Sequence, residues 1–176
     1  IVEKVRPMVK SCVIDTSKSA SAKLTPVPVG SVRLKPDGFW GKYHYATLMR
    51  SLPRLFDLFE EKGILDNFRR RSGRKSCDRR GPLFTDSDIY KWMEGVAWAL
   101  AAADDPAIRD KLETAISEIL PAQCPDGYLN TFFTDPNTRF TDPDAHEMYC
   151  AGHYVQAAVA IHRCLADDRV LNSAVR

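Results

Sequence analysis

Apolar side chains recur three and four positions apart along most of the chain after residue 40, and this spacing is typical of one face of an α-helix. The pattern predicts helices over residues 41–62, 87–103, 107–120 and 145–166. Gly63 and Pro121 follow the first and third of these stretches, where such residues commonly end a helix. The fold class is therefore predicted to be all-α, with very little β-strand.

The same pattern identifies the side chains that should meet between helices. In the first stretch the apolar side consists of Leu48, Leu52, Leu55, Phe56 and Phe59. In the later stretches the side chains expected to be largely buried are Trp92, Val96, Leu112, Ile116, Val155 and Val159. Pro53 removes one backbone hydrogen bond from the first stretch and predicts a kink or a restart there.

Two of the predicted helices form an αα-hairpin, because only a short link separates residue 103 from residue 107. Pro106 suits the first position of the second helix. Thr85 and Asp88 have the spacing of a capping box at the start of the first, with Asp where Glu is usual. A further helix is expected to begin near Val170.

Residues 1–36 lack the helical pattern and are predicted to form an extended N-terminal arm, while residues 37–176 form the helical body. Residues 26–34 alternate apolar with small or polar side chains, and their prolines restrict them to an extended edge or a covering strand. Phe39 and Trp40 stand in a turn at the junction. We expect these two aromatic side chains to anchor the arm onto the body.

Composition narrows the class of protein. With 44% hydrophobic and 27% charged residues, the 176-residue chain has the make-up of one soluble globular domain. A net charge of +2 gives no bulk attraction to nucleic acid or to a membrane surface. No apolar run reaches the length of about 18 residues that a membrane span needs. We therefore expect neither nucleic acid nor membrane as a partner.

The five cysteines are scattered, with an odd total and no CxxC pair. Cys150 and Cys164 lie on one predicted helix, about 21 Å apart along its axis, so they cannot form a disulfide with each other. Scattered reduced thiols favour a cytoplasmic location. The chain begins at Ile1 rather than at Met, so the lack of a signal sequence carries little weight.

A basic run lies between the first two long helices. Seven of the twelve residues from Arg69 to Arg80 are Lys or Arg, and Asp78 is the only acidic residue among them. Nucleic-acid binding is one interpretation, but no aromatic side chains are interleaved with the basic ones. A solvated loop is the favoured interpretation.

The start of the last long helix carries the candidate chemistry. Tyr149, Gly152, His153 and Gln156 fall on one face, and His146 lies two turns before His153 on the same side. This is typical of a core helix with one end opening into a polar pocket. A histidine at a helix start is more often a cap or a hydrogen-bonded core residue, so both interpretations stay open. Histidines about 10 Å apart along the axis do not form a zinc site by themselves.

Five motifs follow one another in a fixed order. They are GFW at 38–40, NFR at 67–69, F-x-DSD-x-YKW-x-E at 84–94, AQ-x-x-DGYL at 122–129 and HEMYCAGHYVQAAVA at 146–160. Over about residues 30 to 176 this order resembles the N-terminal part of glycoside hydrolase family 127, whose best-known activity is β-L-arabinofuranosidase. The resemblance implies an (α/α)6 barrel followed by β-sandwich domains, with residues 37–176 as the N-terminal portion of the barrel.

The resemblance also implies a retaining glycosidase that hydrolyses furanosides of plant-type glycans, with a small carbohydrate as its partner. In the family, a cysteine nucleophile, further cysteines and a glutamate surround a zinc ion, and another glutamate acts as general acid/base. Those residues lie beyond Arg176 in the family sequence. We therefore expect no catalytic residue and no bound zinc in this chain, and no activity from it alone. A homodimer through further C-terminal domains is an arrangement the resemblance allows.

The residues expected to bind the sugar are His146, Glu147, Tyr128, Asp88 and Asn67. His146 matches the sugar-binding histidine of the family's HE-x-Y motif, and its ring can donate one hydrogen bond and accept another. Asn67 stands near the place of a substrate-contacting glutamine. For Asp86 and Asp126 a role as caps or turn-formers is favoured. The alternative function is a non-catalytic helical module that binds carbohydrate or another partner and has lost the chemistry.

Overall fold

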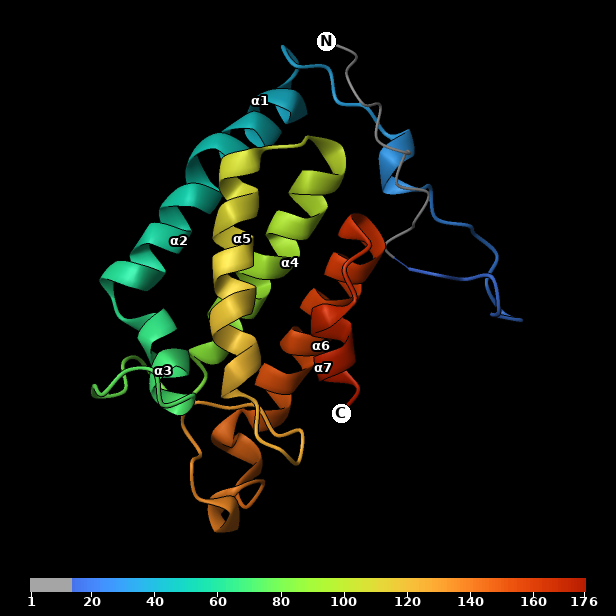
Figure 1. Cartoon of the computed structure of the whole chain (residues 1–176). Coiled ribbons are helices and arrows are strands. Elements are labelled where there is room, and N and C mark those ends of the chain that lie inside the picture. Colours follow the sequence, from blue (N-terminus) through green and yellow to red (C-terminus); the bar gives the residue numbers. More distant parts are fainter. Residues whose placement is uncertain (1–13) are drawn as a thin grey trace.

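The computed structural model describes residues 14–176 (Figure 1). Within that range the chain forms seven α-helices and no β-strand. The helices are α1 (Phe39–Ala46), α2 (Leu52–Glu61), α3 (Ile64–Arg71), α4 (Asp86–Ala102), α5 (Pro106–Ile119), α6 (Glu147–Leu165) and α7 (Arg169–Ala174). The predicted all-α class is confirmed, and so is the helix expected near Val170.

α4 is the central helix of the body. Its most extensive packing is with α6, and it also contacts α2 and α5. Figure 1 shows that α4 and α6 both begin at the lower end of the body, while α5 runs back in the opposite direction. The predicted αα-hairpin is therefore present as α4 and α5. The N-termini of α4 and α6 lie at one end, together with the loop that connects α5 to α6.

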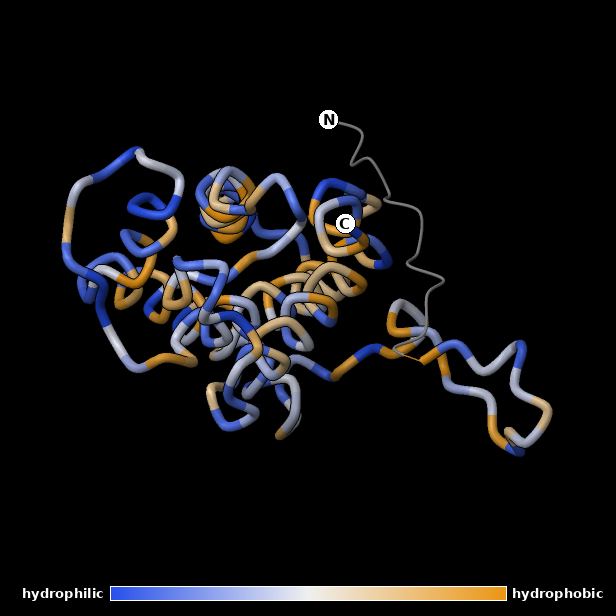
Figure 2. The backbone as a smooth tube through the Cα atoms, turned by 90° about the horizontal axis from the view of Figure 1, so that it is seen from below, coloured by the Kyte–Doolittle hydropathy of each residue, from blue (hydrophilic) through white to orange (hydrophobic). Residues whose placement is uncertain are grey.

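The core forms around α4. Its fully buried side chains include Ile89, Met93, Val96 and Ala97. Trp92 packs on the ring of Phe56 at 5.1 Å between centroids, and its Nε1–H donates to the carbonyl of Leu52 at 2.8 Å. This bond satisfies the polar atom of the buried indole and ties α2 to α4. In Figure 2 the helices carry both orange and blue turns, as amphipathic helices do.

The break predicted at Pro53 is present. Residues Thr47–Ser51 form a π-helical turn between α1 and α2, in which the N–H of Leu52 donates to the carbonyl of Thr47. Pro53 has no N–H to offer to the carbonyl of Met49, four residues before it. The wider hydrogen-bonding pattern therefore lets the chain restart as a regular helix at the proline.

The basic run differs from its prediction. Arg69, Arg70 and Arg71 form the last turn of α3, which sequence reasoning missed, and only residues 72–80 of the run lie in the loop before α4. The interpretation of the whole run as a solvated loop is wrong, because Arg69 is held at the junction of three helices. Its side chain is 21% exposed.

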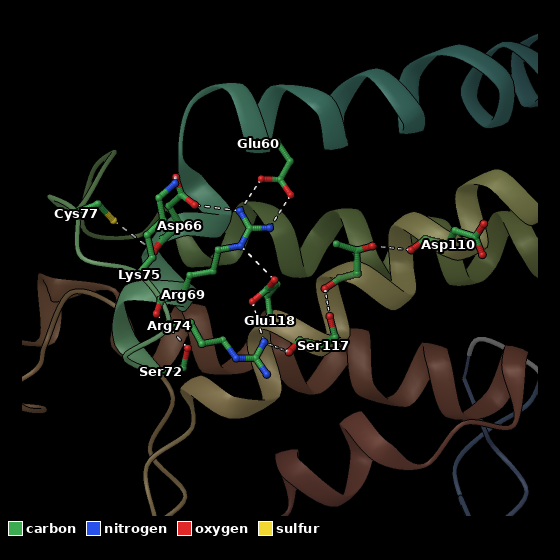
Figure 3. Close-up of polar contacts among 11 residues, drawn as sticks. Glu60, Asp66, Arg69, Ser72, Arg74, Lys75, Cys77, Asp110, Ser117 and Glu118 are labelled. Carbon is green, nitrogen blue, oxygen red and sulfur yellow. Dashed lines mark hydrogen bonds and ion pairs between the residues drawn. The ribbon is translucent and has the colours of Figure 1, made fainter.

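Figure 3 shows the ion pairs of Arg69. The guanidinium group donates to both carboxylate oxygens of Glu60 on α2, at 2.7 and 2.8 Å, and to Asp66 on its own helix at 2.9 Å. Its Nε lies 3.1 Å from Glu118 on α5. These hydrogen bonds, with Glu60 first, raise the pKa of Arg69 further above its usual range. One permanent cation thus joins α2, α3 and α5.

Part of the expected core is not buried. Val155 is 46% exposed, Val159 is only partly buried, and Leu55 is 42% exposed. α6 instead buries the neighbouring face that carries Cys150, Tyr154, Ala157, Ala158 and Ile161. The prediction for Val155 is wrong because helical spacing identifies an apolar stripe but not the side on which a neighbouring helix will lie.

The start of α4 also differs from its prediction. Thr85 has helical backbone angles, and its side chain makes no capping hydrogen bond. A preceding turn leads into the helix instead, with the N–H of Thr85 donating to the carbonyl of Pro82 at 3.0 Å. The capping box is therefore wrong. The helix start predicted at Pro106 is confirmed, since α5 begins there. Asp105 is its N-cap, and its Oδ1 accepts from the N–H of Ile108 at 3.0 Å.

The arm contacts α4 through its 3-10 turn, and the part of the arm before that turn loops away from the helical body (Figures 1 and 2). Residues 1–13 of the expected arm lie outside the described residues. Within residues 26–34 the structure has a 3-10 turn at Val29–Ser31 and no strand. Phe39 and Trp40 are 64% and 69% exposed and contact each other at 5.0 Å. The expected anchoring of the arm by these two side chains is therefore wrong.

Replacing Arg69 tests the junction of the three helices. Arg69→Met should lower the free energy of unfolding by about 2 kcal/mol, because it leaves partly buried carboxylates without their cation. Urea unfolding followed by tryptophan fluorescence measures the change. The control is Arg54→Met, which removes an exposed pair with Glu61 and should cause no measurable change. Equal effects of the two substitutions would contradict the role assigned to Arg69.

Candidate functional site

The candidate site lies where α4 and α6 begin. A 3-10 turn at Pro143–Ala145 leads to His146, which takes left-handed backbone angles with φ of 60°. α6 then starts at Glu147, so the sequence prediction placed its start slightly early. Asp142 caps the 3-10 turn rather than α6, since its Oδ1 accepts from the N–H of Asp144 at 2.9 Å. His146 therefore stands at a sharp corner of the chain.

The ring of His146 is exposed and has one defined hydrogen bond. Its Nδ1 lies 2.6 Å from the carbonyl oxygen of Asp144. A carbonyl oxygen only accepts, so Nδ1 carries the hydrogen, and the neutral ring presents a lone pair on Nε2. The ring also lies 5.3 Å from that of Phe84, just before α4, and 5.6 Å from that of Tyr149. His146 makes no side-chain cap, so the capping interpretation is wrong.

A row of polar and aromatic groups continues from His146 along α6. The ring of Tyr149, 43% exposed, lies 4.6 Å from that of His153. Lys91 reaches across from α4 and places its ammonium 4.9 Å from the centre of the Tyr149 ring. Lys91 also donates to Ser87 Oγ at 3.0 Å and lies 3.5 Å from Asp88. This α4/α6 face combines stacking surfaces with donors and acceptors, as hydroxyl-rich ligands require.

Lys91 remains a cation on this face. Burial alone would lower the pKa of its ammonium, but the hydrogen bond to Tyr149 and the charge of Asp88 outweigh burial and raise it. The position of His153, two turns beyond His146 on the same helix face, predicts a side chain that is mostly buried and hydrogen-bonded. It is partly buried, and among the described residues its Nδ1 is buried without a partner. The expected hydrogen bond is therefore wrong.

Glu147 and Tyr128 form the support beneath His146. Glu147 is 6% exposed, and its Oε1 accepts from the hydroxyl of Tyr128. Its Oε2 accepts from the N–H of Phe140 at 2.6 Å. Burial and then the bond to Glu147 raise the pKa of Tyr128 far above its usual value, so the phenol stays protonated. Both were expected to bind sugar, but both oxygens of Glu147 already accept hydrogen bonds within the chain.

Asp86 has a similar structural role one loop away. It is fully buried, and accepts from the N–H of Thr131 at 2.6 Å and from the Thr131 hydroxyl at 2.5 Å. Arg79 lies 3.8 Å away. Burial raises the pKa of Asp86 despite these partners. The non-binding role favoured by the sequence is consistent with this position, although Asp86 ties a loop rather than caps a helix.

Of the remaining predicted residues, the fold brings Asp88 to the α4/α6 face and keeps Asn67 away from it. Asn67 is fully buried, and its amide both donates to the carbonyl of Arg80 at 2.9 Å and accepts from the N–H of Arg80 at 2.8 Å. It therefore closes the basic loop and is not presented to a ligand. Asp88 is partly exposed beside Lys91. Asp126 shapes its turn, because its carboxylate accepts from the N–H of Tyr128 and pairs with Arg139.

Comparison with known proteins identifies the family of this chain. The sequence profile described as "Beta-L-arabinofuranosidase, GH127 catalytic domain" matches residues 31–176. The chain belongs to this family. A curated relative, the non-reducing end β-L-arabinofuranosidase of Bifidobacterium longum subsp. longum, is 35% identical in an alignment of 115 residues that covers 61% of this chain and 18% of that protein.

Solved GH127 structures share the fold. A β-L-arabinofuranosidase from Geobacillus stearothermophilus T6 has a TM-score of 0.77 and 34% identity, over 82% of this chain and 24% of that chain. Another GH127 β-arabinofuranosidase has a TM-score of 0.76 and 28% identity, over 85% and 25%. The expected αα-hairpins of a family (α/α) barrel are confirmed. The chain spans a quarter or less of the length of each of these relatives.

The side chains of residues 14–176 do not form a site that fits a zinc ion. Within residues 14–176 no three or more His, Cys, Asp or Glu side chains are grouped as a metal would need. Cys150 is buried, its thiol donates to the carbonyl of Phe84, and burial raises its pKa to about 11. A cysteine that binds zinc does so as the thiolate. Among the same residues, no helix combines the length and apolar character needed to cross a bilayer.

A small cavity of about 160 Å³ adjoins the support of His146. Tyr128, Phe140 and Glu147 line one part of it, and Tyr154 and Ser173 line another. Its polar groups bond to one another, since the hydroxyl of Tyr154 donates to Ser173 Oγ at 2.7 Å. His146 does not line this cavity. The exposed histidine and the cavity are thus separate features that share Glu147.

Sequence reasoning did not select Phe84, Lys91 or Tyr149 as site residues. For Tyr149 the signal was present, because helical spacing places it on the face that carries His153. Lys91 and Phe84 both lie in the motif before and at the start of α4. Their approach to α6 depends on the parallel packing of two helices separated by α5, which no local pattern records.

The pH dependence of stability tests the burial of Asp86. Because its pKa is raised in the folded chain, the folded state keeps a proton that the unfolded state has released above about pH 4. The stability contributed by this group should therefore fall as pH rises through that window. Asp86→Asn removes the titration, so its stability relative to the natural chain should rise with pH and then level off. Urea unfolding across the range measures it, and a constant difference would contradict the assignment.

Proposed function

We propose that the α4/α6 face is part of the sugar-binding surface of a β-L-arabinofuranosidase-like glycosidase. The single observation that carries this proposal is the exposed ring of His146, whose Nδ1 is bound to a carbonyl so that Nε2 is left for a ligand. Membership of GH127 and the names of the relatives support arabinofuranosides as the substrate class.

The residues of this face divide the work of holding a furanose. Nε2 of His146 accepts a hydrogen bond from one sugar hydroxyl. The ammonium of Lys91 donates to another, and its charge persists because the pKa is raised. The exposed rings of Phe84 and Tyr149 offer apolar surface to the C–H face of the sugar. Asp88, beside Lys91, supplies a further acceptor at the edge.

The proposal assigns bond cleavage to other parts of the protein. A retaining mechanism with a cysteine nucleophile and zinc remains the expectation from the family resemblance. Among the described residues no fitting ligand set is grouped, and burial keeps the Cys150 thiol protonated, so their contribution is to bind and orient the substrate. A cytoplasmic location and a homodimer through further domains also stay predictions.

Substitution of His146 tests the proposal. The assay uses a version of the protein that extends over the full length of its relatives. His146→Ala should lower kcat/KM on an aryl arabinofuranoside by about 100-fold, equivalent to about 2.7 kcal/mol of transition-state binding. The thermal midpoint should hardly change, because the ring is exposed and has only one hydrogen bond. His146→Asn should act in the same direction, since Asn tolerates the left-handed backbone.

His162→Ala is the matched control for that experiment. His162 is a half-exposed histidine at the other end of α6, paired with Asp168. Its loss should leave kcat/KM unchanged. Full activity of both His146 variants would refute the sugar-binding role.

A second prediction concerns the 176-residue chain alone. It should bind no catalytic zinc and should not hydrolyse an aryl arabinofuranoside, because the residues that it presents bind sugar but do not cleave the bond. The assay is release of the aryl group with and without a chelator. Hydrolysis that a chelator abolishes would show that the chain contains the chemistry. Arabinose binding with no hydrolysis at any length of the protein would favour the non-catalytic module.

A further inference from the structure

We propose that Glu147 is a positioning residue that holds His146 in the tautomer and orientation needed to accept a sugar hydroxyl. The inference rests on the proposed sugar-binding role of His146. Glu147 is next to His146 in the sequence. Unlike the exposed His146, however, its side chain is buried, with 6% exposure. It would act through the backbone of the loop before α6.

The carboxylate of Glu147 closes this loop on itself. Oε2 accepts from the N–H of Phe140 at 2.6 Å, so the first and last residues of the segment 140–147 are joined. Phe140 and His146 have φ of 55° and 60°, in the left-handed region that non-glycine residues rarely occupy. This conformation is unfavourable for a residue with a side chain, so it persists only where other contacts enforce it. The bond from Glu147 is one such contact.

The interior of the closed segment fixes the hydrogen-bond acceptor for His146. Asp142 Oδ1 accepts from the N–H of Asp144 at 2.9 Å, and the carbonyl of Asp142 accepts from the N–H of Ala145 at 3.1 Å. The peptide groups on both sides of Asp144 are thereby held. The carbonyl of Asp144 then lies 2.6 Å from Nδ1 of His146. Its position selects the Nδ1–H tautomer.

A second tether joins the segment to the neighbouring turn. The hydroxyl of Tyr128 donates to Oε1 of Glu147, and the guanidinium of Arg139 lies 3.9 Å from the centre of the Tyr128 ring. Arg139 also pairs with Asp126 at 2.7 Å, in the same turn as Tyr128. Both carboxylate oxygens of Glu147 therefore accept hydrogen bonds from the chain, one from Tyr128 and one from Phe140. Its influence on substrate is therefore indirect.

Without this latch, meaning the bonds of Glu147 to Phe140 and Tyr128, the segment has no side-chain closure. The bonds of Asp142 still hold the peptide groups on both sides of Asp144. The turn that they form is no longer fixed against α6, however, so the Asp144 carbonyl can shift away from Nδ1 and the preference for Nδ1–H weakens. A ring with hydrogen on Nε2 donates to a hydroxyl instead of accepting from it. The same substrate pose would lose its acceptor even though His146 is still present.

The experiment reads the tautomer directly by 15N NMR of the ring nitrogens of His146, in the substrate-free protein at the full length of its relatives. The His146→Asn variant assigns the signal. The natural protein should show Nδ1–H. Glu147→Met, which removes both acceptors, should shift the population toward Nε2–H and lower kcat/KM by about 10-fold. If Glu147→Met does not fold, Glu147→Gln, which keeps one acceptor, should shift the population in the same direction by a smaller amount.

Asp105→Ala is the control for general loss of stability. It removes the N-cap of α5, outside the segment, and should lower the urea concentration at which the protein unfolds while leaving the His146 tautomer unchanged. An unchanged tautomer in the folded Glu147 variants would overturn the positioning role. A shifted tautomer, combined with full activity of His146→Ala, would uphold the latch and refute the proposed function. The two failures are therefore distinguishable.

Discussion

The burial of α4 on several sides at once is the constraint on which the rest of the structure depends. A helix with Ile89, Met93, Val96 and Ala97 all removed from water must be covered from more than one direction, and α2, α5 and α6 provide that cover. Because α6 lies parallel to α4, the two helices begin at the same end. This shared start brings Lys91 of α4 to Tyr149 of α6, and so creates the candidate face from two distant parts of the sequence.

Charged side chains below the surface hold the loops around this core in place. Arg69 joins three helices, Asp86 holds the backbone at Thr131, and Glu147 closes the loop before α6 (Figure 3 shows the first of these). Each of these groups loses its hydrogen bonds to water on burial. Short hydrogen bonds to the chain replace them. The apolar core fixes where the helices lie, while these ionised or polar groups fix the conformation of their ends.

The sequence predicts the helices well and the surfaces between them less well. Periodicity located α4, α5 and α6, and proline chemistry located the break at Pro53, because both act over a few neighbouring residues. α3 was missed because a run of three arginines is typical of a solvated loop, and the pairing of Arg69 with Glu60 and Glu118 on other helices leaves no mark in the local sequence. Likewise, Asn67 and Glu147 were expected to bind the sugar. Only their tertiary contacts show that their polar atoms already make hydrogen bonds within the chain.

The left-handed backbone at His146 places stability and function in opposition at one residue. Glycine takes this conformation without steric cost, so the chain would fold at least as well with no side chain there. Selection for thermal robustness alone would therefore favour losing the imidazole, whereas selection for sugar recognition favours keeping it. In laboratory evolution toward heat resistance without an activity screen, position 146 would be among the first to lose its histidine.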